Sequence, residues 1–218
     1  MRTPSYIIFD LDGTLFDTGP GIMHSVQYAL KQLGIEENDN AALRRFIGPP
    51  LFMSFRNFYG FNDDQASCAV EQYRVLYNKV FIEESYLYPG MADLLKKLKA
   101  AGKHLSIATG KPEHFAVPLT EHSGLRPLFD SLCGISLEDK DMHKKDLIKR
   151  VLEGYGSPAP DLSDVIMIGD RASDITGAHE AGVKAMGVRY GYAASGELEG
   201  AEPDCTADTV EDIGRLLL

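Results

Sequence analysis

Residues 6–18 read YIIFDLDGTLFDT, a pattern that suggests where this chain begins to fold and where it could hold a ligand. It opens with a run of apolar residues and then places three acids, Asp10, Asp12 and Asp17, within eight positions. A carboxylate that leaves a buried strand costs free energy unless something pairs with it. A divalent metal ion with a phosphate ester beside it would satisfy acids grouped in this way. We therefore interpret residues 6–9 as a buried strand that ends at a candidate metal site.

Short apolar runs recur along the chain, each ending in polar or glycine residues, at 104–109, 128–135, 165–170 and 184–191. Continuous apolarity, rather than alternation, is typical of strands that are covered on both faces of a parallel sheet. Apolar residues at helical spacing lie between these runs, at 91–102, 145–156 and 173–182. Strands that alternate with helices predict an α/β doubly wound parallel sheet, in which ligands bind beyond the carboxyl ends of the strands.

One region, from Gly19 to about Tyr86, breaks this alternation, because it contains helical patterns and no convincing strand. We therefore expect a small helical cap domain at 17–87, inserted after the first strand into an α/β core formed by 1–16 and 88–218. Two short connections would let the insert hinge like a lid. The aromatic residues of its middle section are at near-helical spacing and favour a cap core over a base-stacking pocket.

Composition and charge narrow the class of protein. The formal net charge of −10 argues against nucleic acid and anionic membranes as partners. A site for a phosphorylated substrate must therefore gather its own positive charge. The cysteines are three, far apart and without a CxxC pair, which argues against a disulfide framework and a thiolate zinc site. With no signal-peptide pattern and no apolar run of bilayer length, we expect a cytoplasmic monomer or homodimer.

Further polar groups follow the later strands. The hydroxyl of Thr109 and the backbone N–H of Gly110 could hold phosphate oxygens at the end of the run 104–109. Phosphoryl transfer also needs a positioned cation. Residues 138–150 contain four lysines, Lys140, Lys144, Lys145 and Lys149.

The motifs FDLDGTLFDT (9–18), ATGKP (108–112), KKDLI (144–148) and GDRASD (169–174) resemble, in order, the four motifs of the haloacid dehalogenase superfamily, whose members are mostly phosphatases. The resemblance implies that Asp10 is a nucleophile that forms an aspartyl-phosphate and that Asp12 is the general acid and base. Because dehalogenases lack an acid at the second position, Asp12 favours phosphoryl transfer. The resemblance also selects Lys144 as the phosphate-stabilising lysine, with Lys145 as the runner-up and Lys111 as a further alternative.

The same resemblance implies a Mg²⁺ site formed by Asp10, the backbone carbonyl of Asp12, and Asp170. Mg²⁺ prefers oxygen ligands and is often held by a few carboxylates together with substrate phosphate. Asp174 would orient a metal-bound water or pair with Lys144. A plain helix N-terminal acid remains the alternative for Asp174.

The substrate is expected to be a small phosphorylated metabolite. The helical insert resembles the cap of the phosphoglycolate phosphatase-like branch, which makes phosphoglycolate the first candidate. A 5′-nucleotide or pyrophosphate is the alternative, and a phosphosugar mutase or a non-catalytic phosphate-binding protein is a further one. In the insert, the backbone of Gly48 and the side chain of Arg45 or Arg44 could reach substrate, although solvated arginines are an equal interpretation.

Overall fold

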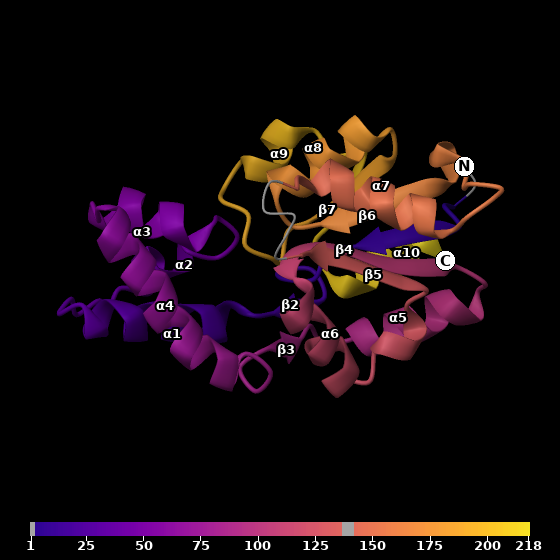
Figure 1. Cartoon of the computed structure of the whole chain (residues 1–218). Coiled ribbons are helices and arrows are strands. Elements are labelled where there is room, and N and C mark those ends of the chain that lie inside the picture. Colours follow the sequence, from indigo (N-terminus) through magenta and orange to yellow (C-terminus); the bar gives the residue numbers. More distant parts are fainter. Residues whose placement is uncertain (1–2, 137–141) are drawn as a thin grey trace. The chain divides into compact units, whose positions relative to one another are not determined.

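The computed structural model describes residues 3–136 and 142–218, and the chain divides into two compact units (Figure 1). The core unit comprises Met1–Asp17 and Leu87–Leu218, and the helical unit comprises Thr18–Tyr86. The boundaries expected from the sequence, 16/17 and 87/88, each differ from these by one residue. Two short strands that the sequence did not indicate, β2 (Phe16–Asp17) and β3 (Tyr86–Leu87), lie where the chain passes between the units.

Within the described residues, six parallel strands form the sheet of the core unit, which confirms the α/β doubly wound prediction. The strand order is β5-β4-β1-β6-β7-β8. The bounds are β1 Tyr6–Phe9, β4 His104–Pro112, β5 Ser131–Ile135, β6 Val165–Gly169, β7 Lys184–Val188 and β8 Cys205–Ala207. Because β1 lies between β4 and β6, the chain order reverses around β1, and ligands of such sheets bind at this point beyond the strand ends.

Helices cover both faces of this sheet (Figure 1). The bounds are α5 Met91–Ala100, α6 Glu113–His122, α7 Lys144–Gly154, α8 Ala172–Ala181, α9 Glu197–Ala201 and α10 Val210–Leu217. The first face carries α7, α8 and α9, whose apolar side chains pack with Ile8 of β1 and Met167 of β6. The opposite face carries α5 and α6, and α10 packs against α5. Burial on both faces explains why the strands are apolar without alternation.

Four strands differ from the expected ranges. β6 ends at Gly169 rather than at residue 170, and β7 ends at Val188 rather than at residue 191. β4 and β5 differ for local reasons. The expectation that a strand ends at Thr109 is wrong, because β4 continues to Pro112 through a shift of register after Ala108. The bulged backbone comes close to β5, where a Cβ on Gly134 would lie 2.6 Å from the carbonyl oxygen of Lys111. The strand expected at 128–135 begins only at Ser131, since Arg126–Leu128 form a 3₁₀ turn, η1. A second 3₁₀ turn, η2, spans Leu162–Asp164 before β6.

The helical unit consists of α1 Gly19–Gln32, α2 Asn40–Arg44, α3 Leu51–Tyr59 and α4 Asp63–Val80. Its core includes aromatic side chains, among which the rings of Phe55 and Phe61 stack with centroids 6.0 Å apart and Phe46 lies 4.9 Å from Phe55. All three residues are buried, so this part of the aromatic run packs the unit internally. In the parts of the chain that the structure describes, no helix is long and apolar enough to cross a membrane.

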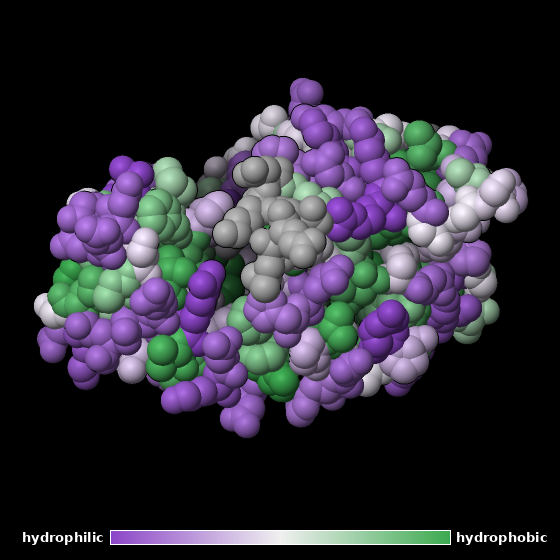
Figure 2. Space-filling model, viewed as in Figure 1, coloured by the Kyte–Doolittle hydropathy of each residue, from purple (hydrophilic) through white to green (hydrophobic). Residues whose placement is uncertain are grey.

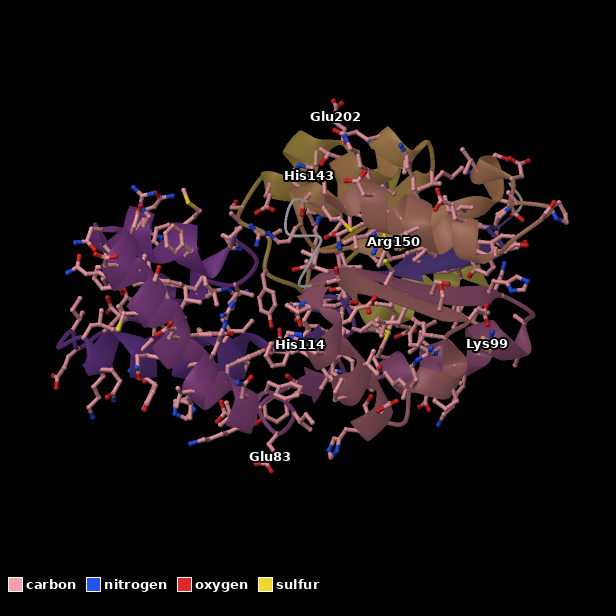
Figure 3. The ribbon with its side chains drawn as sticks, viewed as in Figure 1. Glu83, Lys99, His114, His143, Arg150 and Glu202 are labelled. Carbon is pink, nitrogen blue, oxygen red and sulfur yellow. The ribbon has the colours of Figure 1, made fainter. Side chains whose placement is uncertain are left out.

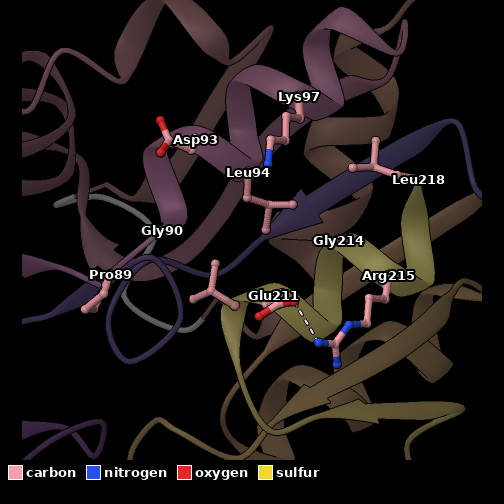
Figure 4. Close-up of a pocket in the computed structure, with 10 residues that line it drawn as sticks. Pro89, Gly90, Asp93, Leu94, Lys97, Glu211, Gly214, Arg215 and Leu218 are labelled. Carbon is pink, nitrogen blue, oxygen red and sulfur yellow. Dashed lines mark hydrogen bonds and ion pairs between the residues drawn. The ribbon is translucent and has the colours of Figure 1, made fainter.

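The surface of the core unit is hydrophilic over α7 on the face shown in Figure 2. A groove of about 630 Å³ lies between α5 and α10 (Figure 4). Its apolar wall includes Leu94 and Val210, and Arg215 at its rim forms an ion pair with Glu211 at 2.7 Å. None of the site residues predicted from the sequence is among the ten that line this groove.

Candidate active site

Two acids stand at the carboxyl ends of neighbouring strands in the core unit. Asp10 directly follows β1 and Asp170 directly follows β6, and these strands pair in parallel. The backbone N–H of Asp10 donates to the carbonyl of Ile168 at 2.8 Å, which extends the pairing to this acid. Both acids are buried, Asp10 with 8% of its surface exposed and Asp170 with none. The sheet therefore brings together two acids that lie 160 residues apart in the chain.

Lys144, the first residue of α7, joins these acids to a third. Its Nζ lies 2.8 Å from Oδ1 of Asp10 and 2.8 Å from Oδ1 of Asp174, and it donates to the carbonyl of Ala108 at 2.9 Å. Burial lowers the pKa of this ammonium, but the charges of Asp10 and Asp174 raise it by more, so that the net shift is upward. Lys144 is therefore held as a cation in contact with the candidate nucleophile.

The other candidate lysines differ in position from Lys144. Lys145 pairs with Glu180 at 3.2 Å, and both of these side chains are well exposed. Lys140 lies outside the described residues. Among the two adjacent lysines that the sequence left open, the geometry brings Lys144 to Asp10 and directs Lys145 to the surface of α8.

Asp174 combines the two interpretations that the sequence kept apart. It lies in the first turn of α8, where its Oδ2 accepts from the backbone N–H of Arg171 at 3.0 Å. Its Oδ1 faces Lys144, so the same carboxylate caps the helix and pairs with the ammonium. A Cβ on Gly169 would lie 2.2 Å from Cγ of Asp174, which explains why the motif begins with glycine.

Asp170 is held by a backbone N–H and a hydroxyl that no sequence motif assigns to it. Its Oδ2 accepts from the backbone N–H of Tyr192 at 2.7 Å, and its Oδ1 accepts from the hydroxyl of Thr14 at 3.3 Å. Gly13 and Gly191 permit this approach, because a Cβ on either residue would come within 2.5 Å of Asp170 side-chain atoms. Thr14 belongs to the first motif, so its presence near the site could have been inferred from the sequence. A backbone donor such as that of Tyr192 has no sequence signal of its own.

The acids form a cluster with the chemistry of a cation site. One carboxylate oxygen from each of Asp10, Asp170 and Asp174 lies within 4.8 Å of the other two. Burial raises the pKa of Asp170 well above its ordinary value, and the charges of Asp174 and Asp10 raise it further. Lys144 offsets one of the three formal negative charges. A divalent cation, which prefers oxygen ligands, would match the two that remain.

The second motif places Thr109 and Lys111 beside each other on the bulged end of β4. Thr109 is buried, and its Oγ1 accepts from the backbone N–H of Lys111 at 3.2 Å, whereas Gly110 is exposed. The Nζ of Lys111 donates to both carboxylate oxygens of Asp12 at 3.2 Å. The sequence considered Lys111 only as an alternative to Lys144, but the two lysines contact different acids.

The candidate residues of the insert belong to the helical unit. Arg45 is exposed, and its guanidinium carbon lies 3.9 Å from the ring centroid of Phe58. Arg44 is the last residue of α2, and Gly48 is exposed with a φ of 104°. Contact between these residues and a substrate stays a prediction.

Comparisons with known proteins agree with the family that the sequence motifs resemble. A model of the haloacid dehalogenase-like hydrolase family matches residues 7–188. A 5′-nucleotidase from Pseudomonas aeruginosa is 40% identical over 203 residues, which cover 93% of this chain and 90% of that protein. A phosphoglycolate phosphatase from Agrobacterium fabrum is 30% identical over 207 residues, covering 92% and 87% respectively. The crystal structure of a provisionally named phosphatase from Clostridium difficile has 38% identity, full coverage of both chains and a TM-score of 0.92.

The chain therefore belongs to the haloacid dehalogenase-like hydrolase family. Within that family it is a phosphatase, a hydrolase that acts on phosphate esters.

Proposed function

We propose that this phosphatase is a Mg²⁺-dependent phosphomonoesterase that transfers a phosphoryl group first to Asp10 and then to water. The observation that carries the proposal is the buried cluster in which Lys144 contacts Asp10 and Asp174 while Asp170 lies within a few ångströms. Splitting one difficult displacement into two steps requires a nucleophile and a proton-transferring group side by side. Asp10 and Asp12, two residues apart, supply that pair.

The metal would be held by Asp10 and Asp170, with the backbone carbonyl of Asp12 as the third protein ligand expected from the family resemblance. Asp174 is a poorer candidate ligand, because its two oxygens already face Lys144 and the backbone N–H of Arg171. When bound, Mg²⁺ would neutralise charge on the transferred phosphoryl group and on the acids around it.

The remaining steps belong to the side chains. An oxygen of Asp10 forms a bond to phosphorus as the ester bond to the leaving oxygen breaks, and Asp12 donates its proton to that oxygen. Asp12 then takes a proton from water, whose oxygen bonds to phosphorus while the bond to Asp10 breaks. Lys144 stabilises negative charge that spreads over the equatorial oxygens. Thr109 and the N–H of Gly110 would bind the remaining phosphate oxygens.

For the substrate we favour a nucleoside 5′-monophosphate, with phosphoglycolate second. The reason is that the relative named 5′-nucleotidase shares 40% identity with this chain, against 30% for the phosphoglycolate phosphatase. This reverses the order expected from the sequence, which placed phosphoglycolate first. Pyrophosphate remains a substrate to be assayed beside them.

The test is a phosphate-release assay on nucleoside 5′-monophosphates, 2-phosphoglycolate and pyrophosphate, with Mg²⁺ and with EDTA. Asp10→Asn should abolish turnover and leave the melting temperature close to that of the wild type, because the amide has a similar shape but is a poor nucleophile. Phosphate release at the wild-type rate by Asp10→Asn would refute the covalent route. Isomer formation without phosphate release would indicate a mutase instead.

A further inference from the structure

Lys111 occupies an unusual place for a lysine. Its side chain is only 4% exposed, although it lies next to the exposed Gly110 on the bulged end of β4. Its Nζ is 3.2 Å from each of the two carboxylate oxygens of Asp12. A buried ammonium is costly unless it is paired and hydrogen-bonded. The ion pair with Asp12 therefore offsets the cost of burying the ammonium of Lys111.

The two ends of this ion pair differ in their access to solvent. The carboxylate of Asp12 is 25% exposed, whereas the side chain of Lys111 is almost fully covered. The equal distances from Nζ to the two oxygens place the ammonium astride the carboxylate, which restricts the side-chain torsions of Asp12. Lys111 thus contacts both oxygens of Asp12, while a quarter of the Asp12 side chain remains exposed.

The backbone around Lys111 is also constrained. Its N–H donates to Oγ1 of the buried Thr109, and its carbonyl passes so close to Gly134 that a Cβ there would clash at 2.6 Å. From this bulged segment between Ala108 and Pro112, the side chain of Lys111 reaches Asp12. Sequence spacing alone does not reveal this contact.

We propose that Lys111 is a positioning residue that acts through Asp12, holding the carboxyl group of Asp12 where it can protonate the leaving oxygen. This inference rests on the proposed function, in which Asp12 is the general acid. It gives Lys111 a role different from that of Lys144, which contacts Asp10 and serves the phosphoryl group. The consequence is that Lys111 matters most for substrates whose leaving group needs a proton.

The test uses two substrates of nearly the same shape, phenyl phosphate and p-nitrophenyl phosphate. Nitrophenolate departs readily without protonation, whereas phenolate departs slowly. We expect Lys111→Met to lower kcat/KM for phenyl phosphate by about tenfold to a hundredfold, and for p-nitrophenyl phosphate by less than about threefold, given what general acids typically contribute. We use kcat/KM because it reports the reaction from free enzyme and substrate up to the first phosphoryl transfer. It excludes the later hydrolysis of the phosphorylated Asp10, a step that is identical for all substrates.

A matched control comes from another lysine ion pair of the core unit. Lys99 pairs with Asp130 at 2.7 Å at the opposite, amino end of the strands, and Figure 3 shows it apart from His143, which precedes Lys144. Lys99→Met should leave kcat/KM for both substrates unchanged. Lys111→Arg, which keeps a pair of donors for a carboxylate, should restore the wild-type ratio between the two substrates to within about threefold.

A second comparison keeps the proposal testable if Lys111→Met folds poorly. In an Asp12→Asn background the side chain at position 12 is a neutral amide, so Lys111→Met leaves no unpaired charge. There we expect Lys111→Met to cause no further loss of kcat/KM for phenyl phosphate, because residues that act through each other are not additive. An equal loss for both substrates, or an undiminished loss in the Asp12→Asn background, would overturn the inference and point to direct phosphate contact. The proposed function is tested separately: if the wild type releases phosphate and Asp10→Asn does not, that function holds whatever the Lys111 variants show.

Discussion

The contact between α7 and α8 at Gly177 can be tested by adding a single methyl group. A Cβ on Gly177 would lie 2.7 Å from Cβ and 2.9 Å from Cγ of Lys144, and 3.0 Å from the backbone nitrogen of Lys145. Carbon atoms in contact are normally about 3.5–4.0 Å apart. The obstacle is the stem of a side chain and a backbone atom, so it cannot swing aside. Gly177→Ala should therefore push the start of α7 away from α8 by about 1 Å.

The expected effects on stability and activity differ in size. Alanine in a helix gains up to about 1 kcal/mol over glycine. Overpacking of a close contact costs about 1–3 kcal/mol, so the free energy of unfolding should fall by up to about 2 kcal/mol. Activity should fall further, because Lys144 contacts Asp10 and Asp174 at 2.8 Å and a misplacement of about 1 Å can cost about a hundredfold in rate.

The chain supplies the matched control in Gly154, the last residue of α7. It is exposed, and a Cβ there would meet nothing within 4 Å. Gly154→Ala should therefore leave kcat unchanged and stabilise the protein by up to about 1 kcal/mol. Urea denaturation and p-nitrophenyl phosphate hydrolysis measure both quantities on both variants. If Gly177→Ala were stabilising with an unchanged kcat, the reasoning that α8 fixes Lys144 by contact would be refuted.

Two further predictions address the metal site and the far end of α7. Asp170→Asn should weaken Mg²⁺ binding by at least about tenfold in calorimetric titration, a loss typical even of residues that only support a metal ligand; the same affinity as the wild type would contradict its assignment as a ligand. Burial raises the pKa of Tyr155 from 10.0 to about 12, and its hydroxyl lies 2.6 Å from Oγ of Ser106. The stability that depends on the neutral phenol is therefore complete below pH 10 and is lost as the pH rises toward 12. Over this pH range the melting temperature of Tyr155→Phe should fall less than that of the wild type. Equal falls in the two proteins would contradict a stabilising role of the neutral Tyr155 hydroxyl.

Much of the core unit could be predicted from local sequence. The apolar runs at β1, β4, β6 and β7 mark strands buried on both faces, since no alternation is needed there. The predicted ranges of β4 and β5 were wrong because of irregular backbone, namely the bulge after Ala108 and the 3₁₀ turn that precedes β5. The short strands β2, β3 and β8, which were not predicted, carry too few residues for a periodic signal.

From its local motifs the sequence predicts that acids follow the ends of two buried strands, because strand ends and carboxylates are both local features around Asp10 and Asp170. The tertiary structure was needed to establish that Lys144 rather than Lys145 contacts Asp10: the family resemblance favoured Lys144, but the contact itself depends on how α7 packs against α8. It also decided that Lys111 turns to Asp12 and that a backbone N–H at Tyr192 holds Asp170. These contacts depend on a bulge and on a backbone donor, and neither property is encoded in the identity of a single residue.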